Sequence, residues 1–140
     1  MRGIRDMTEQ ISIYAENKKG AMSTITGLLK DAEINIMSIL TNDSGEFGTV
    51  RMLVSDVPLA KDVFEKAGYQ VHIDHVIGIY MEDRCGGLNE ILQAITDSNI
   101  NIHYIYISYD RENASPIAIM KTSGYAEVES CLRSKGYRLL

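Results

Sequence analysis

Two short stretches of the chain combine residue types that can hold a small charged group. Each has a polar side chain, Asn17 or Asp83, followed three residues later by a glycine that precedes a predicted helix. Backbone N–H groups at the start of a helix have no carbonyl partner within it and attract anions. The side-chain oxygen of Asn17 or Asp83 can accept a hydrogen bond from a cation. The candidate ligand-binding residues at and beside these stretches are Asn17, Gly20, Ala21, Met22, Asn35, Asp83, Gly86, Gly87, Leu88 and Asn101.

Simpler roles for the same residues stay open. Asn17 and Asp83 are also typical of residues that cap a turn or helix, and glycine suits such a turn without any ligand. Asn35 and Asn101, which begin the strand after each helix, can bond neighbouring backbone alone. Cys85 precedes a helix start, where a thiolate is stabilised, but no resolving cysteine lies near it, so an incidental thiol is the favoured reading.

The two stretches are copies of each other. Glu16–Ile36 aligns with Glu82–Ile102 at a spacing of 66 residues, and matched pairs include glycine with glycine and asparagine with asparagine. A turn-and-helix device that occurs twice indicates a duplicated small domain, so we expect the function to lie in what the two turns do together.

Hydrophobic periodicity places the elements that position these residues. Alternation over two residues indicates strands, and apolar residues three to four apart indicate helices. Asp56 is the expected N-cap of the second helix, and Gly68 and Gly136 are expected to end helices. The predicted strands are 10–15, 34–41, 47–54, 69–73, 76–81, 100–109, 115–121 and 137–140. The predicted helices begin near residues 21, 57, 88 and 125, and the last two end at Ser98 and Ser134. Residues 1–9 are expected to form a short arm, and residues 42–45 a hairpin turn.

The resulting order, β-α-β-β-α-β twice with almost no linker, predicts an α+β fold. Each half would be a split βαβ unit of the ferredoxin-like kind, with an antiparallel sheet and its helices on one face. We expect the first repeat to span residues 8–74 and the second residues 75–140.

Composition and charge exclude several classes of function. The net charge is −5 over 140 residues, without the clustered basic face of nucleic-acid binders or the basic surface that anionic membranes attract. No apolar run is long enough to span a bilayer, and the N-terminus lacks the apolar core of a secretory signal, so we expect a cytoplasmic protein with free thiols. His72 and His75 point to opposite faces of a strand and predict no metal site.

The repeated motif resembles that of the ACT domain, whose turn reads Asp-x-Pro-Gly-x-Leu and is followed, after the helix, by Gly-[Ile/Val]-Asn-[Ile/Val]. The second copy has Asp83-Arg84-Cys85-Gly86-Gly87-Leu88 and then Asn99-Ile100-Asn101-Ile102. The first has Asn17-Lys18-Lys19-Gly20-Ala21-Met22 and then Glu33-Ile34-Asn35-Ile36. Lys19 and Cys85 replace the proline, which removes a constraint on φ. The linkerless pair resembles stand-alone tandem ACT proteins.

That resemblance implies a regulatory sensor that binds a free amino acid between paired domains and signals to a metabolic enzyme. The positions matching Asn17, Asp83, Asn35 and Asn101 are those implied to touch the ligand, at the junction of two repeats or two chains. No nucleophile–base pair or phosphate-binding loop is visible, so we expect a non-enzyme without cofactor. The alternative is a dimeric regulatory subunit or interaction module that docks to an amino-acid-metabolism enzyme without binding a ligand.

One strand predicts a homodimer. Both alternating sets of Ile100–Tyr109 are apolar, with Ile102, Tyr104 and Tyr106 expected on one face and Ile105, Ile107 and Tyr109 on the other. A strand buried on both faces needs a second layer, which a second copy of the chain would provide. A β-bulge that shifts the phase of the strand is the competing explanation.

Overall fold

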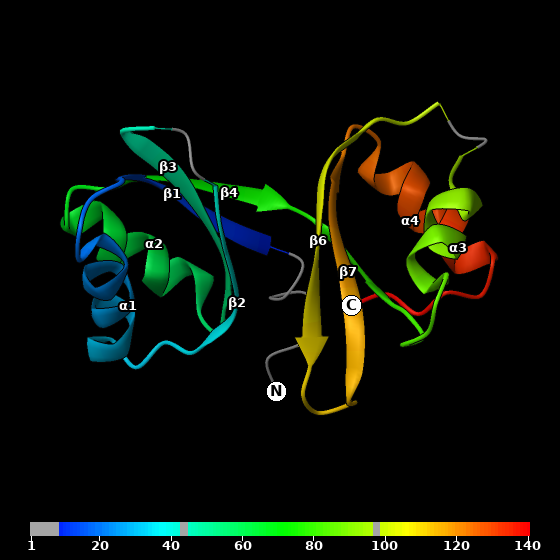
Figure 1. Ribbon diagram of the computed structural model, residues 1–140, viewed down its shortest axis with the longest axis horizontal. Helices are drawn as coiled ribbons and strands as arrows, with labels where there is room; N and C mark the ends of the chain where they lie inside the picture. Colours follow the sequence, from blue (N-terminus) through cyan, green and yellow to red (C-terminus); the bar gives the residue numbers. More distant parts are fainter. Residues whose placement is uncertain (1–8, 43–44, 97–98) are drawn as a thin grey trace. The chain divides into compact units, whose positions relative to one another are not determined.

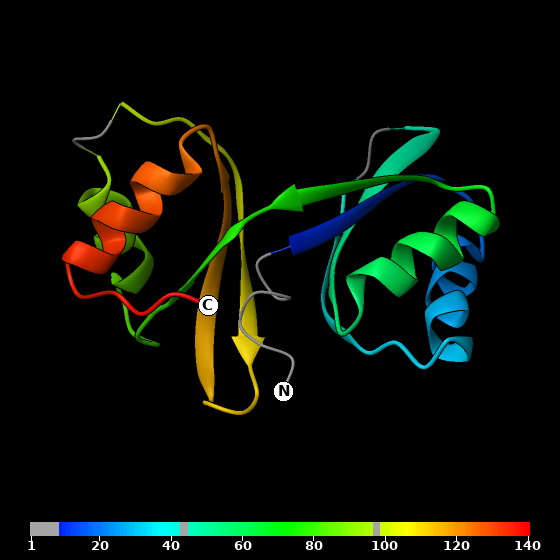
Figure 2. The same ribbon diagram turned by 180° about the vertical axis from the view of Figure 1, so that it is seen from behind.

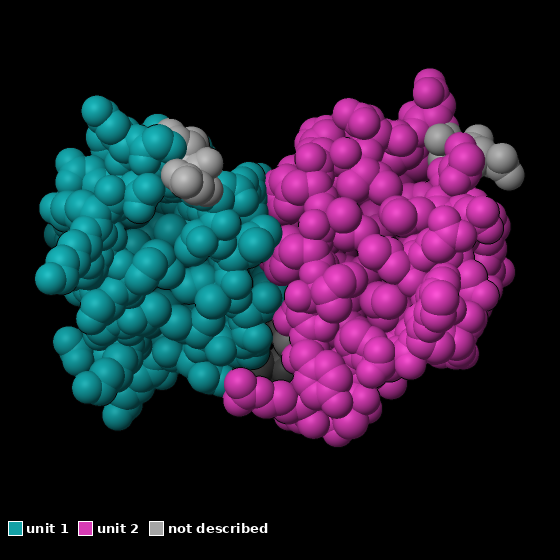
Figure 3. All heavy atoms as spheres, viewed as in Figure 1, with its two compact units in different colours: residues 1–74 teal, residues 75–140 magenta. Residues whose placement is uncertain are grey.

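The chain divides into two compact units with the same architecture. The computed structural model describes residues 9–42, 45–96 and 99–140. Unit 1 is Met1–Asp74 and unit 2 is His75–Leu140, coloured teal and magenta in Figure 3. In each unit an antiparallel sheet carries two helices on one face (Figure 1), as the view from behind also shows (Figure 2). The α+β class with helices on one sheet face is therefore confirmed.

Unit 1 has the predicted order of strands and helices. Its sheet runs β2-β3-β1-β4, so the antiparallel strand β3 lies between β1 and β2. This is the split βαβ arrangement. The elements are β1 (Glu9–Glu16), α1 (Ala21–Asp31), β2 (Ile36–Thr41), β3 (Phe47–Val54), α2 (Val57–Lys66) and β4 (Gln70–His75).

Local signals set the helix ends of unit 1. The backbone N–H of Leu59 donates to the Asp56 carboxylate at 3.1 Å, which confirms the predicted N-cap of α2. Gly68 ends α2 with φ +92°, and the bond from the Tyr69 N–H to the Phe64 carbonyl completes a Schellman motif. The core forms where helix and sheet faces meet, and its fully buried side chains include Ile11, Ile13, Ile25, Leu29, Met52 and Phe64.

Unit 2 repeats this plan with a shorter last strand. Its elements are β5 (Ile77–Tyr80), α3 (Gly87–Ala94), β6 (Ile102–Asp110), β7 (Ser115–Thr122) and α4 (Tyr125–Ser134), with sheet order β5-β7-β6. The predicted strand 137–140 is wrong as a full strand. Only an isolated bridge joins Leu139 to Ile79, flanked by bonds from Tyr80 N–H to the Arg138 carbonyl and from Leu140 N–H to the Gly78 carbonyl.

Two further predictions differ from the structure or lie outside it. Helix α3 ends at Ala94 instead of the predicted Ser98, because the chain tightens into a turn in which Thr96 N–H bonds the Gln93 carbonyl. Residues 97–98 lie outside the described residues, as do residues 1–8 of the predicted arm 1–9 and residues 43–44 of the predicted turn 42–45.

Strand β6, whose two faces were both predicted to be buried, contains a β-bulge. The pairing of β6 with β7 shifts between Ile102 and Tyr104. Ile102 and Ile105 both pack on the core of unit 2, so the expectation that they face opposite ways is wrong. The β-bulge of the competing explanation is therefore present, and its extra residue changes the phase of the strand. The homodimer stays a prediction. The corresponding strand β2 has the same shift between Ile36 and Ser38.

The described helices are short, and none has the length and apolar character needed to cross a bilayer. The longest, α1, has 11 residues, about half of what a bilayer requires.

Candidate functional site

The first turn is held at the end of the sheet by its own hydrogen bonds. Asn17 N–H donates to the Glu46 carbonyl at 2.7 Å, and its side-chain Nδ2 donates to the Gly45 carbonyl at 3.1 Å. These bonds join the β1 end of the turn to the β2–β3 hairpin. Gly20 is the N-cap of α1 with φ +83°, a left-handed conformation that favours glycine. Asn17 therefore anchors the turn, as the simpler interpretation predicts.

A cleft of about 140 Å³ opens between this turn, the start of α1 and the end of the sheet. Of the predicted ligand-binding residues it contains Asn17, Ala21 and Met22, while Gly20 stands beside it. The first N–H groups of α1 lack carbonyl partners within the helix. The lining residues are Ala15, Glu16, Asn17, Lys18, Ala21, Met22, Thr41, Asn42, Gly48, Thr49 and Val50.

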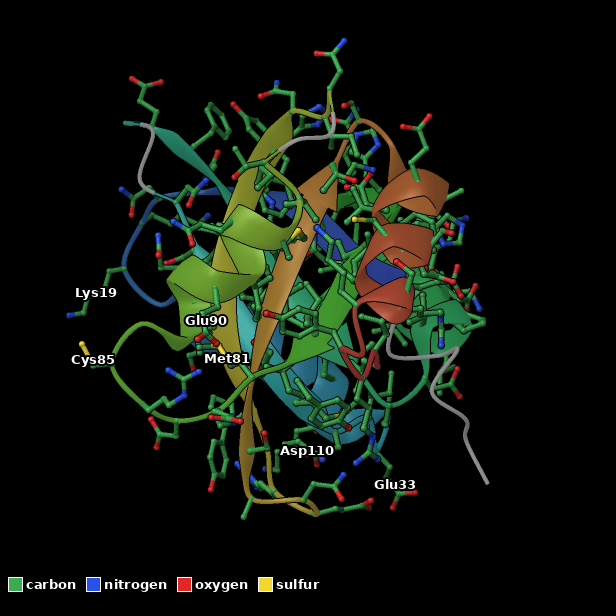
Figure 4. The ribbon with its side chains drawn as sticks, turned by 90° about the vertical axis from the view of Figure 1, so that its right-hand side faces the viewer. Lys19, Glu33, Met81, Cys85, Glu90 and Asp110 are labelled. Atoms are coloured by element: carbon green, nitrogen blue, oxygen red, sulfur yellow. The ribbon has the colours of Figure 1, made fainter. Side chains whose placement is uncertain are left out.

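The cleft carries charges of both signs. Lys18 Nζ lies 3.2 Å from Glu16 Oε2, and both side chains are more than half exposed. Each charge can therefore turn toward a ligand at little cost, because exposed ion pairs are weak. Lys19, by contrast, projects outward from the turn (Figure 4) and does not line the cleft.

The second turn is closed by Arg84, which is not among the candidate ligand-binding residues. Arg84 Nε lies 2.6 Å from Glu82 Oε2, and its Nη2 lies 2.5 Å from Glu90 Oε2 in the first turn of α3. Hydrogen bonding to Arg84 lowers the pKa of Glu90, and hydrogen bonding to Glu90 and then Glu82 raises the pKa of Arg84. One guanidinium thus joins both ends of the turn.

Gly87 makes the second turn tighter than the first. A Cβ at this position would lie 2.6 Å from the Glu82 carbonyl oxygen, a distance that a real side chain does not tolerate. The matching residue of the first turn is Ala21, whose Cβ is accommodated and lines the cleft. Asp83 and Cys85 are exposed on the second turn, and Cys85 points outward (Figure 4).

The structure does not bring Asn35 or Asn101 to the turn of its own unit. Strands β1 and β2 are both antiparallel to β3, so they are parallel to each other. The turn follows the end of β1, whereas Asn35 precedes the start of β2, at the opposite end of the sheet. The Asn35 backbone N–H donates to Ser55 Oγ, and the Ser55 N–H donates to the Asn35 carbonyl, both at 2.9 Å. Asn101 and Ser123 form the same two bonds at 3.1 Å.

A polar cluster pins the β6–β7 hairpin of unit 2. Tyr80 Oη donates to Asp110 Oδ2 at 2.7 Å, and Asn113 Nδ2 donates to the same oxygen at 2.5 Å. The Arg138 guanidinium stands 4.5 Å over the Tyr80 ring. Burial, followed by the bond to Asp110, raises the pKa of Tyr80, and the bond from Asn113 leads those that lower the pKa of Asp110.

Residues 9–42, 45–96 and 99–140 contain all three histidines and both cysteines of the chain. Within them no three His, Cys, Asp or Glu side chains gather as metal ligands do. Cys85 and Cys131 are free thiols.

The candidate residues did not include Glu16, Lys18 or Arg84, because the motif Asp-x-Pro-Gly-x-Leu does not specify a residue type at these positions. The signal was present: each copy has an acidic residue two positions before a basic one, Glu16 with Lys18 and Glu82 with Arg84. Glu90, in the first turn of its helix, has no acidic counterpart in the first copy, where Thr24 occupies the position.

Comparison with known proteins agrees with this geometry. A family model described as an ACT domain pair matches residues 7–129. The crystal structure of protein BT0572 from Bacteroides thetaiotaomicron superposes with a TM-score of 0.88 and 26% identity, over 95% of this chain and 91% of that one. No curated protein gives a significant sequence match.

More distant structures share the fold. The ligand-free regulatory subunit of aspartate kinase from Thermus thermophilus has a TM-score of 0.65 at 16% identity, over 89% of this chain and 87% of that chain. A structure of aspartokinase alpha and beta subunits has a TM-score of 0.63 at 15% identity, over 92% of each chain. Since the family model spans most of the chain, and both units show the split βαβ fold that it implies, the protein belongs to the ACT domain pair family.

Proposed function

We propose that the protein is a regulatory sensor that binds a free amino acid at the first turn and signals its presence to a metabolic enzyme. The observation that carries the proposal is the cleft of about 140 Å³ at the start of α1, lined by both a carboxylate and an ammonium group. This volume is below the roughly 300–1,000 Å³ of pockets for drug-sized molecules and suits a small ligand.

The charges of the cleft match those of a zwitterion. A ligand carboxylate would bind the N–H groups at the start of α1, where the helix dipole favours negative charge, assisted by Lys18. A ligand ammonium would bind Glu16, with the carbonyl oxygen of the Asn17 amide as a further acceptor. Binding would separate Glu16 from Lys18 and replace their pair with two ligand contacts.

The partner enzyme is proposed from similar structures. Two structural relatives are a regulatory subunit of aspartate kinase and a structure of aspartokinase alpha and beta subunits. At 15–16% identity they share only the fold, so the identity of any enzyme partner of this chain is part of the proposal.

The proposed function includes the bounds of the two repeats and a dimer of two chains. We place the two ACT repeats at residues 8–74 and 75–140, and we expect a homodimer in the cytoplasm. Because Asn35 and Asn101 lie away from the turn of their own unit, they can contribute to a site only if the turn comes from another repeat or another copy. Light scattering at micromolar concentration should give the mass of two chains; the mass of one chain would contradict the dimer.

A thermal-shift screen over the twenty amino acids tests the function. At a ligand concentration near 100 times Kd, binding adds about 2.7 kcal/mol to the free energy of unfolding, a rise of roughly 5–10 °C in Tm. We expect one amino acid, or a few similar ones, to produce the shift. Asn17→Ala should abolish it, and Asp83→Ala at the matching position of the closed turn should preserve it. A flat screen at millimolar concentrations would reject sensing and leave ligand-independent docking.

A further inference from the structure

The cleft at the first turn has an apolar floor as well as charged side chains. The floor is formed by Ala15 and Val50, which are 7% and 3% exposed and belong to the core of unit 1. They come from the neighbouring strands β1 and β3, on the face of the sheet that carries the helices. The charged lining residues, Glu16 and Lys18, are exposed. A ligand whose charged groups bind at the turn therefore has an apolar surface beside it.

In the second copy, the corresponding space is filled by a side chain of the protein itself. At the spacing of 66 residues between the copies, Met81 matches Ala15 and Gly87 matches Ala21. Met81 points toward the start of α3 (Figure 4) and packs against the core of unit 2. Its Cε lies 3.5 Å from the position that a Cβ on Gly87 would take. The Met81 side chain thus reaches from the end of β5 to the start of α3.

In the first copy, Ala15 leaves this space open. Alanine ends at Cβ, whereas methionine continues through Cγ, Sδ and Cε. Ala15 at the end of β1 and Ala21 at the start of α1 both line the cleft, so a ligand can enter where Met81 lies in unit 2. Because Met81 is apolar and the floor of the first cleft is alanine and valine, the ligand group that fits there is aliphatic.

The size and charge of the cleft restrict this group further. Its volume of about 140 Å³ is close to the roughly 150 Å³ of an engineered cavity that holds one benzene molecule. It accommodates the backbone atoms of an amino acid and a short side chain, but not an aromatic ring or a long chain in addition. Apart from Glu16 and Lys18, the lining residues are uncharged, so a charged ligand side chain would have no counter-ion among them.

We propose that the ligand of the first turn is an amino acid with a short aliphatic side chain, of the size of valine, and that this side chain lies between Ala15 and Ala21. This assignment rests on the proposed function, in which an amino acid binds at the first turn. Ala15 then determines specificity, because its small side chain leaves room for that of the ligand. Glu16 and Lys18 bind the ammonium and carboxylate groups that all these ligands share.

Calorimetric titration of the intact chain with alanine, valine, threonine, phenylalanine and lysine tests the assignment. Valine should bind at least about tenfold more tightly than alanine, because one methylene in a hydrophobic pocket changes binding by about 10- to 200-fold. Threonine has the shape of valine with a hydroxyl in place of a methyl group, and it should bind more weakly than valine by up to about 100-fold. Phenylalanine and lysine should bind more weakly still.

Variants of the two walls test where the ligand side chain lies. Ala15→Val and Ala21→Val each fill part of the space, and each should reduce the preference for valine over alanine by about tenfold. This ratio reports on the shape of the site, which a general loss of stability would not change. Ala21→Val covers the case that valine at the buried position 15 prevents folding, and circular dichroism checks each variant. The matched control is Ala67→Val at the exposed C-cap of α2, which should leave both affinities unchanged.

The outcomes separate this assignment from the proposed function. Tighter binding of threonine, phenylalanine or lysine than of valine would overturn the aliphatic ligand and leave amino-acid sensing in place. A ratio of valine to alanine affinity that neither wall variant changes would also overturn it, because the side chain would then lie elsewhere. A flat response to all twenty amino acids would reject the proposed function itself, and the assignment with it.

Discussion

At the residue scale, Glu33 at the end of α1 has a left-handed backbone conformation that suits glycine. Helices α1, α2 and α4 all end in a Schellman motif, with left-handed residues Glu33, Gly68 and Gly136. In α1 the motif is formed by bonds from Glu33 N–H to the Lys30 carbonyl at 3.0 Å and from Ile34 N–H to the Leu29 carbonyl at 2.9 Å. Glu33 has φ +57°, where a Cβ crowds the following carbonyl.

Glu33→Gly should therefore stabilise the protein. Removing the Cβ relieves a left-handed strain of about 1–2 kcal/mol, partly offset by the greater entropy of glycine in the unfolded chain. We expect a net gain of about 0.5–1 kcal/mol in the free energy of unfolding, measured by urea denaturation. Glu33→Ala is the control, since it removes the carboxylate but keeps the Cβ; an equal gain from alanine would show that charge, and not backbone strain, is responsible.

A second residue-scale prediction concerns Gly87. Its Cβ position lies 2.6 Å from the backbone oxygen of Glu82, and backbone cannot move aside as a flexible side chain can. Gly87→Ala should destabilise the chain by about 1–3 kcal/mol, as overpacking does. The converse change in the first turn, Ala21→Gly, meets no such conflict and serves as the comparison. If the two variants unfold at the same denaturant concentration, the second turn is not as tight as the structure indicates.

At the element scale, the sequence predicted which segments are helices and strands, but it predicted only some of their end residues correctly. The bounds of β3 and α4 agree with the prediction because turn residues or a glycine mark their ends. The two apolar faces of β6 left a β-bulge open as one explanation, but alternation alone does not locate the extra residue in β2 or β6. The closed second turn depends on how Arg84, Glu90 and the Gly87 backbone meet in space. Its glycines were visible in the sequence, but their effect on the cleft was not.

The β6–β7 hairpin gives an element-scale prediction of pH dependence. Hydrogen bonds, first that from Asn113, hold the pKa of Asp110 below its ordinary value. A carboxylate with a lowered pKa in the folded state adds stability above its unfolded pKa, about 3.9, and this stability is lost as pH falls through the folded pKa. The stability difference between the unmodified chain and Asp110→Asn should therefore be largest near neutral pH and shrink below about pH 4.

Urea denaturation at neutral and acidic pH measures this difference. Because Asp110 lies near the surface, its contribution should be small. Glu112→Gln makes the same change of charge in the same hairpin without removing a side-chain partner of Tyr80, and it is the appropriate comparison. A difference between Asp110→Asn and the unmodified chain that stays constant with pH would mean that the ionised carboxylate is not what pins the hairpin.

At the scale of the whole molecule, the two matching turn-and-helix segments differ in the space and the charges at their turns. The first turn has Ala21 and leaves a cleft with a movable Glu16–Lys18 pair. The second has Gly87 against the Glu82 carbonyl and an arginine held by two carboxylates. Arg84 and Glu90 already neutralise each other at the start of α3, where an incoming carboxylate would need the same helix end. The two matching turns therefore offer different surroundings to an incoming ligand.

This inequality predicts the stoichiometry of the proposed amino-acid binding. Isothermal titration should give about one ligand per chain and not two, because a cleft opens at the start of α1, whereas Gly87 packs against the Glu82 carbonyl and Arg84 is paired with two carboxylates at the start of α3. Lys18→Ala should weaken binding, while Arg84→Ala, the same change at the matching position of the closed turn, should leave the affinity of the first site unaltered. A measured value of two ligands per chain, or equal losses from both variants, would show that the second turn opens in solution and that the ion pairs of Arg84 do not keep it closed.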